Sequence, residues 1–199
     1  MAVQRPADTL DEALRLFRAG EFARALTLTA SACAAAPWSD RALLIHAIIR
    51  IRTQHFELAM VALLRAIALN PGNGDTLHKL GQCALEMNQY ADAESWSLRA
   101  VSVRPNWADP YFMIGSNYYA LRNYAAAAEW LARAVACRPN WAAAQFAVGR
   151  TLFLSGQRSA ASSWLSKAVA LDPGFRKHEE FLLATLTPDD FETWFAEPM

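Results

Sequence analysis

The side chains that could do chemistry in this chain are few and widely spaced. The histidines and cysteines are His46, His55, His78, His178, Cys33, Cys83 and Cys137. They show no metal-ligand spacing, and the sequence has neither a glycine-rich phosphate loop nor a nucleophile elbow. The best candidate for a general base is His78, because Asp75, Lys79 and Gln82 share its helical face. A solvated polar surface explains that grouping better, so we expect no catalytic residue, no metal site and no cofactor.

Composition narrows the classes of function further. Of the 199 residues, 54% are hydrophobic and 19% are charged, whereas a soluble domain usually carries about 25% charged residues. We therefore expect some apolar surface to meet a partner. The nineteen basic and nineteen acidic residues cancel. This balance argues against a general nucleic-acid binder and against a basic membrane-surface helix.

The N-terminal sequence predicts a cytoplasmic protein without membrane insertion. Residues 1–20 carry charges from Arg5 to Arg18 and lack an apolar stretch of signal-peptide length. The most apolar runs, such as 42–49, are far shorter than the roughly 18 residues of a transmembrane helix. The odd number of scattered cysteines suits a reducing compartment, where we expect them to act as small apolar side chains.

The regular spacing of some prolines indicates the helices that must position any functional site. One set recurs at a fixed interval of 34 positions: Pro37, Pro71, Pro105, Pro139 and Pro173. Each is expected to end a helix, because proline cannot donate the helical hydrogen bond. A fixed period of this length is typical of helix–turn–helix solenoids, in which a repeat buries its apolar face only when a neighbour stacks on it.

Small residues recur at fixed places within each period, and two helices can interlock closely only at such places. They are Ala13, Ala47, Gly81, Gly115 and Gly149 in the expected first helices, and Ala25, Ala59, Ala93, Ala127 and Ala161 in the second. The predicted helix pairs are 8–19 with 22–35, 40–53 with 56–69, 74–87 with 90–103, 108–121 with 124–137, and 142–155 with 158–171. Thr9 and Glu12 are predicted to form a capping box at the start of the first helix.

This arrangement resembles the tetratricopeptide repeat family, whose pattern runs W–LG–Y, then A, F and A, then P. The fullest match is carried by Tyr111, Ile114, Gly115, Tyr118, Tyr124, Ala127, Leu131, Ala134 and Pro139. The resemblance implies an all-α, right-handed solenoid of five repeats, at approximately 6–39, 40–73, 74–107, 108–141 and 142–175. We expect a capping helix at 176–186 and an acidic–aromatic tail at 187–199, which can form a short helix. His46 replaces a family leucine, and we expect it to donate a hydrogen bond inside its helix pair.

In tetratricopeptide repeat proteins the first helices line an inner groove, so the resemblance implies where a partner binds. The corresponding residues are Arg41, Leu44, Ile45, Ile48, Arg52, Asp75, His78, Lys79, Gln82, Asp109, Phe112, Met113, Ser116, Phe146 and Arg150. We expect Ile45, Ile48, Phe112 and Met113 to be exposed there as apolar anchors. Such a mixture of apolar and charged side chains suits a peptide or an amphipathic helix of another protein. The residues that clamp a terminal carboxylate in chaperone-tail binders do not match, so we exclude that mode.

Two aromatic sets leave alternatives open. Trp96, Trp130 and Trp164 recur on the second helices, where they either pack between repeats, as their period favours, or form an exposed stripe for a second partner. The tail contains no basic residue and combines Asp189, Asp190, Phe191, Trp194 and Phe195. It is either a ligand motif or a second cap. As a ligand it would dock on its own last repeat or in a neighbouring molecule's groove, where Arg18, Arg41 and Arg52 offer the opposite charge.

The sequence thus predicts a non-catalytic adaptor or chaperone-like scaffold that holds a segment of a partner protein. Two alternatives remain open. One is a regulatory or substrate-presenting subunit of an enzyme complex, such as a transferase. The other is a homo-oligomeric scaffold that assembles through its tail and groove.

Overall fold

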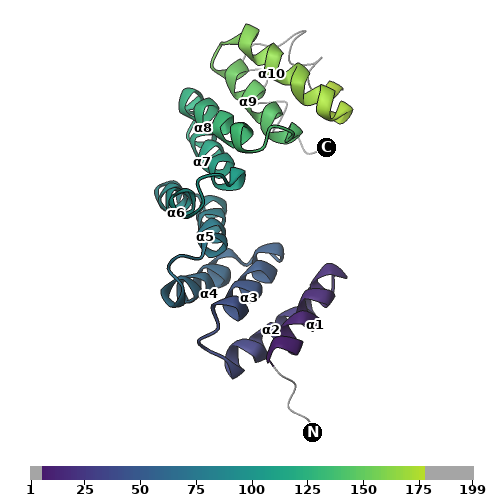
Figure 1. Cartoon of the computed structure of the whole chain (residues 1–199), viewed down its shortest axis with the longest axis vertical. Coiled ribbons are helices and arrows are strands. Elements are labelled where there is room, and N and C mark those ends of the chain that lie inside the picture. The colour runs from purple at the N-terminus through teal and green to yellow at the C-terminus, as the bar shows by residue number, and fades with distance from the viewer. Residues whose placement is uncertain (1–5, 178–199) are drawn as a thin grey trace. The chain divides into compact units, whose positions relative to one another are not determined.

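The computed structural model describes residues 6–177, which form ten α-helices and one 3-10 turn (Figure 1). The first helices of the pairs are α1 (Pro6–Arg18), α3 (Asp40–Arg52), α5 (Gly74–Glu86), α7 (Ala108–Ala120) and α9 (Ala142–Leu154). The second helices are α2 (Phe22–Ala35), α4 (Phe56–Leu69), α6 (Tyr90–Val103), α8 (Tyr124–Cys137) and α10 (Arg158–Leu171), and η1 (Pro173–Phe175) follows. The second helices have the predicted bounds, and the first helices end one residue earlier than predicted.

Two units make up this architecture, with the boundary after Arg104. The first unit contains α1 to α6 and the second contains α7 to α10 with η1. In both units each odd-numbered helix packs against the even-numbered helix that follows it, and that helix packs against the next odd-numbered one of the same unit. This successive pairing confirms the predicted all-α solenoid. The predicted cap at 176–186 lies almost wholly outside the described residues, and the tail at 187–199 lies entirely outside them.

The start of the first helix differs from the prediction. Because α1 begins at Pro6, Thr9 lies inside the helix and cannot be its N-cap. Glu12 pairs with Arg15 one turn later. The predicted capping box is therefore wrong. A proline in the first turn of a helix costs no hydrogen bond, because the N–H groups there have no helical partner in any case.

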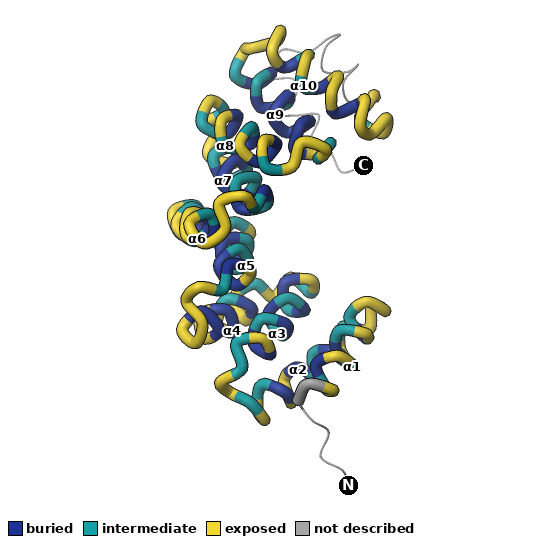
Figure 2. The backbone as a smooth tube through the Cα atoms, viewed as in Figure 1, coloured by how far each residue is buried: buried dark blue, intermediate teal, exposed yellow. Residues whose placement is uncertain are grey.

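The small residues close the interior of each pair, as predicted. The alanines at these positions, such as Ala25 and Ala127, are fully buried. Along the helices, buried and exposed stretches alternate (Figure 2). A Cβ atom added to Gly115 would lie 2.6 Å from Leu131 Cγ, and one added to Gly149 would lie 2.7 Å from Leu165 Cγ. The two helices of a pair therefore touch at these points, and the exposed side chains lie on the helix faces turned away from them.

Candidate functional site

The predicted partner-binding residues of α3 fall on two different faces of the helix. Arg41, Leu44, Ile48 and Arg52 follow one another at intervals of three and four residues, so they share a face. Both arginines are exposed and both aliphatic side chains are half-buried. Ile45 points elsewhere. It is only 6% exposed and belongs to the apolar core formed with α1 and α2, so the expectation that it is exposed is wrong.

The next first helix, α5, carries polar side chains at the repeat positions that Leu44, Ile45 and Ile48 occupy on α3. His78, Lys79 and Gln82 are half-buried, and Lys79 Nζ donates a hydrogen bond to Gln82 Oε1 at 2.9 Å. Helix α5 contacts α3 directly. We call the surface formed by Arg41, Leu44, Ile48, Arg52, His78, Lys79 and Gln82 the α3/α5 face. It combines an apolar centre with a positive rim.

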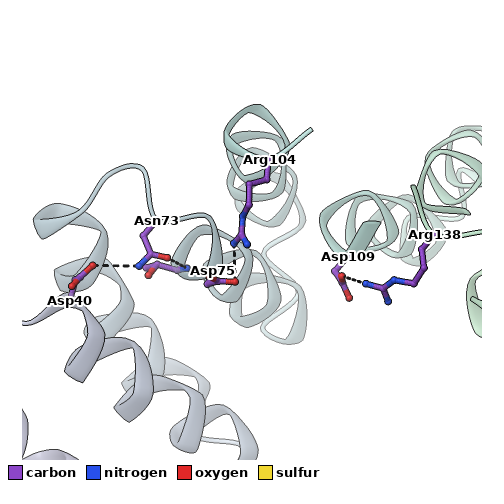
Figure 3. Close-up of polar contacts among 7 residues, drawn as sticks. Asp40, Asn73, Asp75, Arg104, Asp109 and Arg138 are labelled. Atoms are coloured by element: carbon purple, nitrogen blue, oxygen red, sulfur yellow. Dashed lines mark hydrogen bonds and ion pairs between the residues drawn. The ribbon is translucent and has the colours of Figure 1, made fainter. Parts of the chain in front are cut away.

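Two acidic residues of the predicted groove are occupied by contacts inside their own helix pairs. Arg104, which follows α6, pairs with Asp75 at the start of α5 at 2.8 Å, and Arg138 pairs with Asp109 in the same manner at 2.5 Å (Figure 3). These ion pairs join the start of a first helix to the end of its second helix. Asp75 and Asp109 therefore form contacts within their own repeats, and we call each of these ion pairs a latch.

In the pair of α3 and α4, asparagine amides replace the arginine as the donors to the aspartate. Asp40 accepts a hydrogen bond from Asn70 Nδ2 at 2.8 Å. It also accepts one from Asn73 Nδ2 at 3.4 Å (Figure 3). These bonds, that from Asn70 above all, lower the pKa of Asp40. The amide of Asn73 also caps α5, because its Oδ1 accepts from the Thr76 N–H at 3.1 Å.

In the second unit the apolar members of the predicted groove serve as packing residues. Met113 is 9% exposed and Phe146 is 6% exposed, so the expectation of exposure is wrong for Met113, and Phe146 belongs to the core. Phe112 is half-buried and its ring centroid lies 4.7 Å from that of Trp141. Phe146 stacks on Phe175 at 4.8 Å. The aromatic residues that follow the repeat-ending prolines thus cover these two rings.

The polar members of the second unit are also engaged. Ser116 Oγ donates to the Phe112 carbonyl at 3.0 Å. The Arg150 guanidinium lies 4.3 Å from the centroid of the Tyr119 ring, and burial lowers the pKa of Arg150. The candidate site therefore narrows to the α3/α5 face of the first unit.

The recurring tryptophans of the second helices carry a feature that the sequence analysis missed. Each ring is half-buried and has a cation three residues later: Arg99 lies 4.6 Å from the Trp96 ring, Arg133 lies 4.3 Å from Trp130, and Lys167 lies 4.6 Å from Trp164. Trp130 also stacks on Tyr111. These contacts favour the packing interpretation. The i, i+3 spacing of tryptophan and cation was the available signal.

His46 links two successive helix pairs. Its Nδ1 lies 2.8 Å from Thr29 Oγ1 on α2, and Arg50 Nε donates to its Nε2 at 3.4 Å. Because Nε2 accepts this bond, the neutral ring donates from Nδ1 to Thr29. The predicted hydrogen bond is present, but it joins α3 to the preceding pair and not to α4. Burial, assisted by the charge of Arg50, lowers the pKa of His46.

This arrangement predicts a loss of stability on mild acidification. A histidine whose pKa is lower in the folded chain binds fewer protons there than when unfolded, so its stabilising contribution is present above pH 6.5 and lost as the pH falls below it. We expect the free energy of urea unfolding to decline between about pH 7 and pH 5. His46→Leu, which installs the family residue, should flatten this decline. An identical pH profile for both proteins would contradict the prediction.

Between residues 6 and 177, histidine, cysteine and acidic side chains nowhere gather in a group of three or more that could hold a metal ion. None of the helices in that range combines the length and the hydropathy that a membrane span needs.

Stacked antiparallel helix pairs that interlock through glycine and alanine define a helical-repeat solenoid. Sequence models of the tetratricopeptide repeat family match residues 62–95 and 108–140. The second match covers α7 and α8 together with the turn between them. These two matches agree with the family resemblance of the sequence pattern. Among curated protein sequences no significant match is found.

Solved structures of similar fold agree with the solenoid architecture. A MamA protein shares 19% sequence identity at a TM-score of 0.74, with 92% of this chain and 98% of that chain covered. TTC0263, a tetratricopeptide repeat protein of Thermus thermophilus, shares 19% identity at a TM-score of 0.73, with 91% and 100% covered. YrrB, described as having an unusual peptide-binding site, shares 21% identity at 0.68, with 86% and 90% covered. At these identities the likeness concerns the fold.

Proposed function

We propose that this protein is a non-catalytic adaptor or chaperone-like scaffold that binds a segment of a partner protein on its α3/α5 face. The row on α3 carries the proposal, because Leu44 and Ile48 remain partly accessible between the exposed Arg41 and Arg52. Arg41 reaches Asp11 only at 3.5 Å, and within residues 6–177 no carboxylate forms an ion pair with Arg52. Two cations with so little intramolecular compensation favour an acidic partner.

The other repeats support a specific role for this row. At the position of Ile48 three of the other four repeats carry a polar residue, namely Gln82, Ser116 and Arg150. The fold therefore accepts polar residues at this position, so packing alone does not require the aliphatic Ile48. A partner segment with two apolar side chains about one helical turn apart, flanked by carboxylates, would complement the row. Lys79 and Gln82 add polar contacts alongside.

The experiment compares two substitutions at the same repeat position in the full-length chain. The partner is first identified by mass among the chains that co-purify with the protein, and its affinity for each variant is then measured. Ile48→Glu should weaken binding by about tenfold or more, because it places a charge at the apolar centre of the face. Ser116→Glu is the matched control and should bind as the unchanged protein does.

Helical content and thermal midpoint should be similar in both variants, since both side chains are partly exposed. Unchanged partner affinity for Ile48→Glu would overturn the proposed site. The same purification separates the alternatives. A co-purifying transferase would indicate a regulatory subunit, whereas a particle mass in light scattering that is a multiple of the chain mass would indicate a homo-oligomeric scaffold.

A further inference from the structure

The outer surface of α4 exposes large apolar side chains that the fold does not require. Leu58 is 51% exposed and Val61 is 59% exposed. In the other four repeats the position of Leu58 holds Arg24, Asp92, Ala126 and Ala160, and that of Val61 holds Thr27, Ser95, Glu129 and Ser163. The other repeats thus serve as internal controls. Because the other repeats pack with small or polar residues at these positions, packing does not explain Leu58 and Val61. We therefore attribute these exposed apolar side chains to the binding of another segment.

These two side chains border an open hollow of about 460 Å³ between α2 and α4. Helix α3 contributes His46 and Arg50 to its lining, and Arg65 and Cys33 contribute from α4 and α2. Its volume lies in the range of roughly 300–1,000 Å³ that ligand pockets have. It therefore has room for a large side chain.

The charged side chains that line this α2/α4 hollow are all positive. Arg50 and Arg65 are its charged lining residues, and the described residues place no carboxylate in its wall. Burial and the charge of Arg50 lower the pKa of His46, which favours the neutral form of its ring. An occupant must therefore combine an apolar group for Leu58 and Val61 with negative charges for the two arginines.

The chain itself contains a segment of this chemistry outside the described residues. Between Pro188 and Met199 the acidic residues are Asp189, Asp190, Glu192 and Glu197, the aromatic residues are Phe191, Trp194 and Phe195, and no basic residue occurs. We propose that residues 188–199 dock in the α2/α4 hollow, with an aromatic side chain against Leu58 and Val61 and carboxylates paired with Arg50 and Arg65. This site lies between second helices and is separate from the α3/α5 face, which first helices form.

The three cysteines allow a test in the full-length chain. Cys33 lines the hollow and is half-buried, Cys137 is half-buried in the second unit, and Cys83 is fully buried with its pKa raised by burial to about 12. Alkylation by iodoacetamide at about pH 8.5, where thiolate forms, is followed by mass spectrometry for each cysteine. Cys33 reports occupancy of the hollow, Cys137 reports general reactivity, and Cys83 reports unfolding.

The first comparison changes the segment. In a full-length variant with Phe191→Ala, Trp194→Ala and Phe195→Ala, Cys33 should react at least about fivefold faster than in the unchanged protein. A synthetic peptide of residues 188–199 should restore protection, and one with asparagine and glutamine in place of the acids should protect far less. The rate at Cys137 should stay constant, and Cys83 should remain unreactive.

The second comparison changes the hollow to the residues that other repeats carry. Leu58→Ala with Val61→Ser should make Cys33 as reactive as the tail variant does, and added peptide should not restore protection. Ile48→Glu, which tests the α3/α5 face, should leave protection of Cys33 intact, so the two proposals fail independently. Equal Cys33 rates in the unchanged and tail-variant proteins, together with no protection by added peptide, would overturn the inference.

Light scattering over a wide concentration range then shows where the segment comes from. A mass that rises with concentration, and no longer rises in either variant, supports docking between copies. A constant monomer mass with a protected Cys33 supports docking within one copy. A rising mass that both variants retain would mean that self-association uses another surface, and would count against the hollow.

Discussion

Gly115→Ala is expected to lower the free energy of unfolding by about 2 kcal/mol. The new Cβ atom would lie 2.6 Å from Leu131 Cγ, 2.9 Å from Leu131 Cδ2 and 3.1 Å from the Leu131 backbone nitrogen. The leucine side chain can rotate, but the backbone nitrogen moves only if α8 shifts. Overpacking of this kind costs about 1–3 kcal/mol or more, and the better helix propensity of alanine returns about 1 kcal/mol.

The chain offers both a repeat of this test and a control for it. In Gly149→Ala the new Cβ atom would meet Leu165 at nearly the same distances, so this variant should lose a similar amount of stability. Gly72→Ala is the control, because a Cβ atom there has no neighbour within 4 Å. Its midpoint in urea should stay close to that of the unchanged protein. If Gly115→Ala and Gly72→Ala unfold alike, the tight contact between α7 and α8 is not important for stability.

The sequence was sufficient for the fold because the same local signals recur in every repeat. A proline ends each second helix, and small residues mark each close approach, so the errors of individual signals cancel over the repeats. The first helix shows what happens without that support. No earlier repeat fixes its start, and the local pattern of Thr9 and Glu12 predicted a cap where the helix has already begun.

The candidate site was less predictable because exposure depends on the neighbouring repeat. Ile45 and Ile48 are equally apolar, yet only Ile45 enters the core formed with α1 and α2. For Phe112 and Phe146 the decisive neighbours are Trp141 and Phe175, which cover them from the residues beyond the repeat-ending prolines. A periodic face identifies which residues share a side of a helix, but it does not say what lies above them.

A signal for these covering contacts was nevertheless present in the sequence. Trp141 stands 29 positions after Phe112, and Phe175 follows Phe146 at the same interval. The latches show it again, since Arg104 follows Asp75, and Arg138 follows Asp109, at this interval too. Such spacing in this chain joins the first helix of a repeat to the end of that repeat. Complementary residues at this interval therefore predict contact and weaken the case for partner binding.

Phe146→Ala tests whether Phe146 packs inside its repeat or binds a partner. If it packs, we expect a loss of about 3–4 kcal/mol in the free energy of unfolding, the largest effect of any variant proposed. The ring is 6% exposed, lies in one core cluster with Phe153 and Leu165, and stacks on Phe175. Truncation removes this buried area and leaves a cavity lined by side chains that cannot all collapse into it. Urea unfolding followed by circular dichroism measures the loss.

Two further variants make this outcome specific. Phe146→Leu keeps most of the volume and should cost less than about 1.5 kcal/mol. Leu121→Ala removes an apolar side chain of the same unit that is 49% exposed, and it should change little. An exposed groove anchor would behave differently, because its truncation would weaken partner binding and leave the unfolding midpoint unchanged. A loss below about 1 kcal/mol for Phe146→Ala would therefore return this residue to the partner-binding surface.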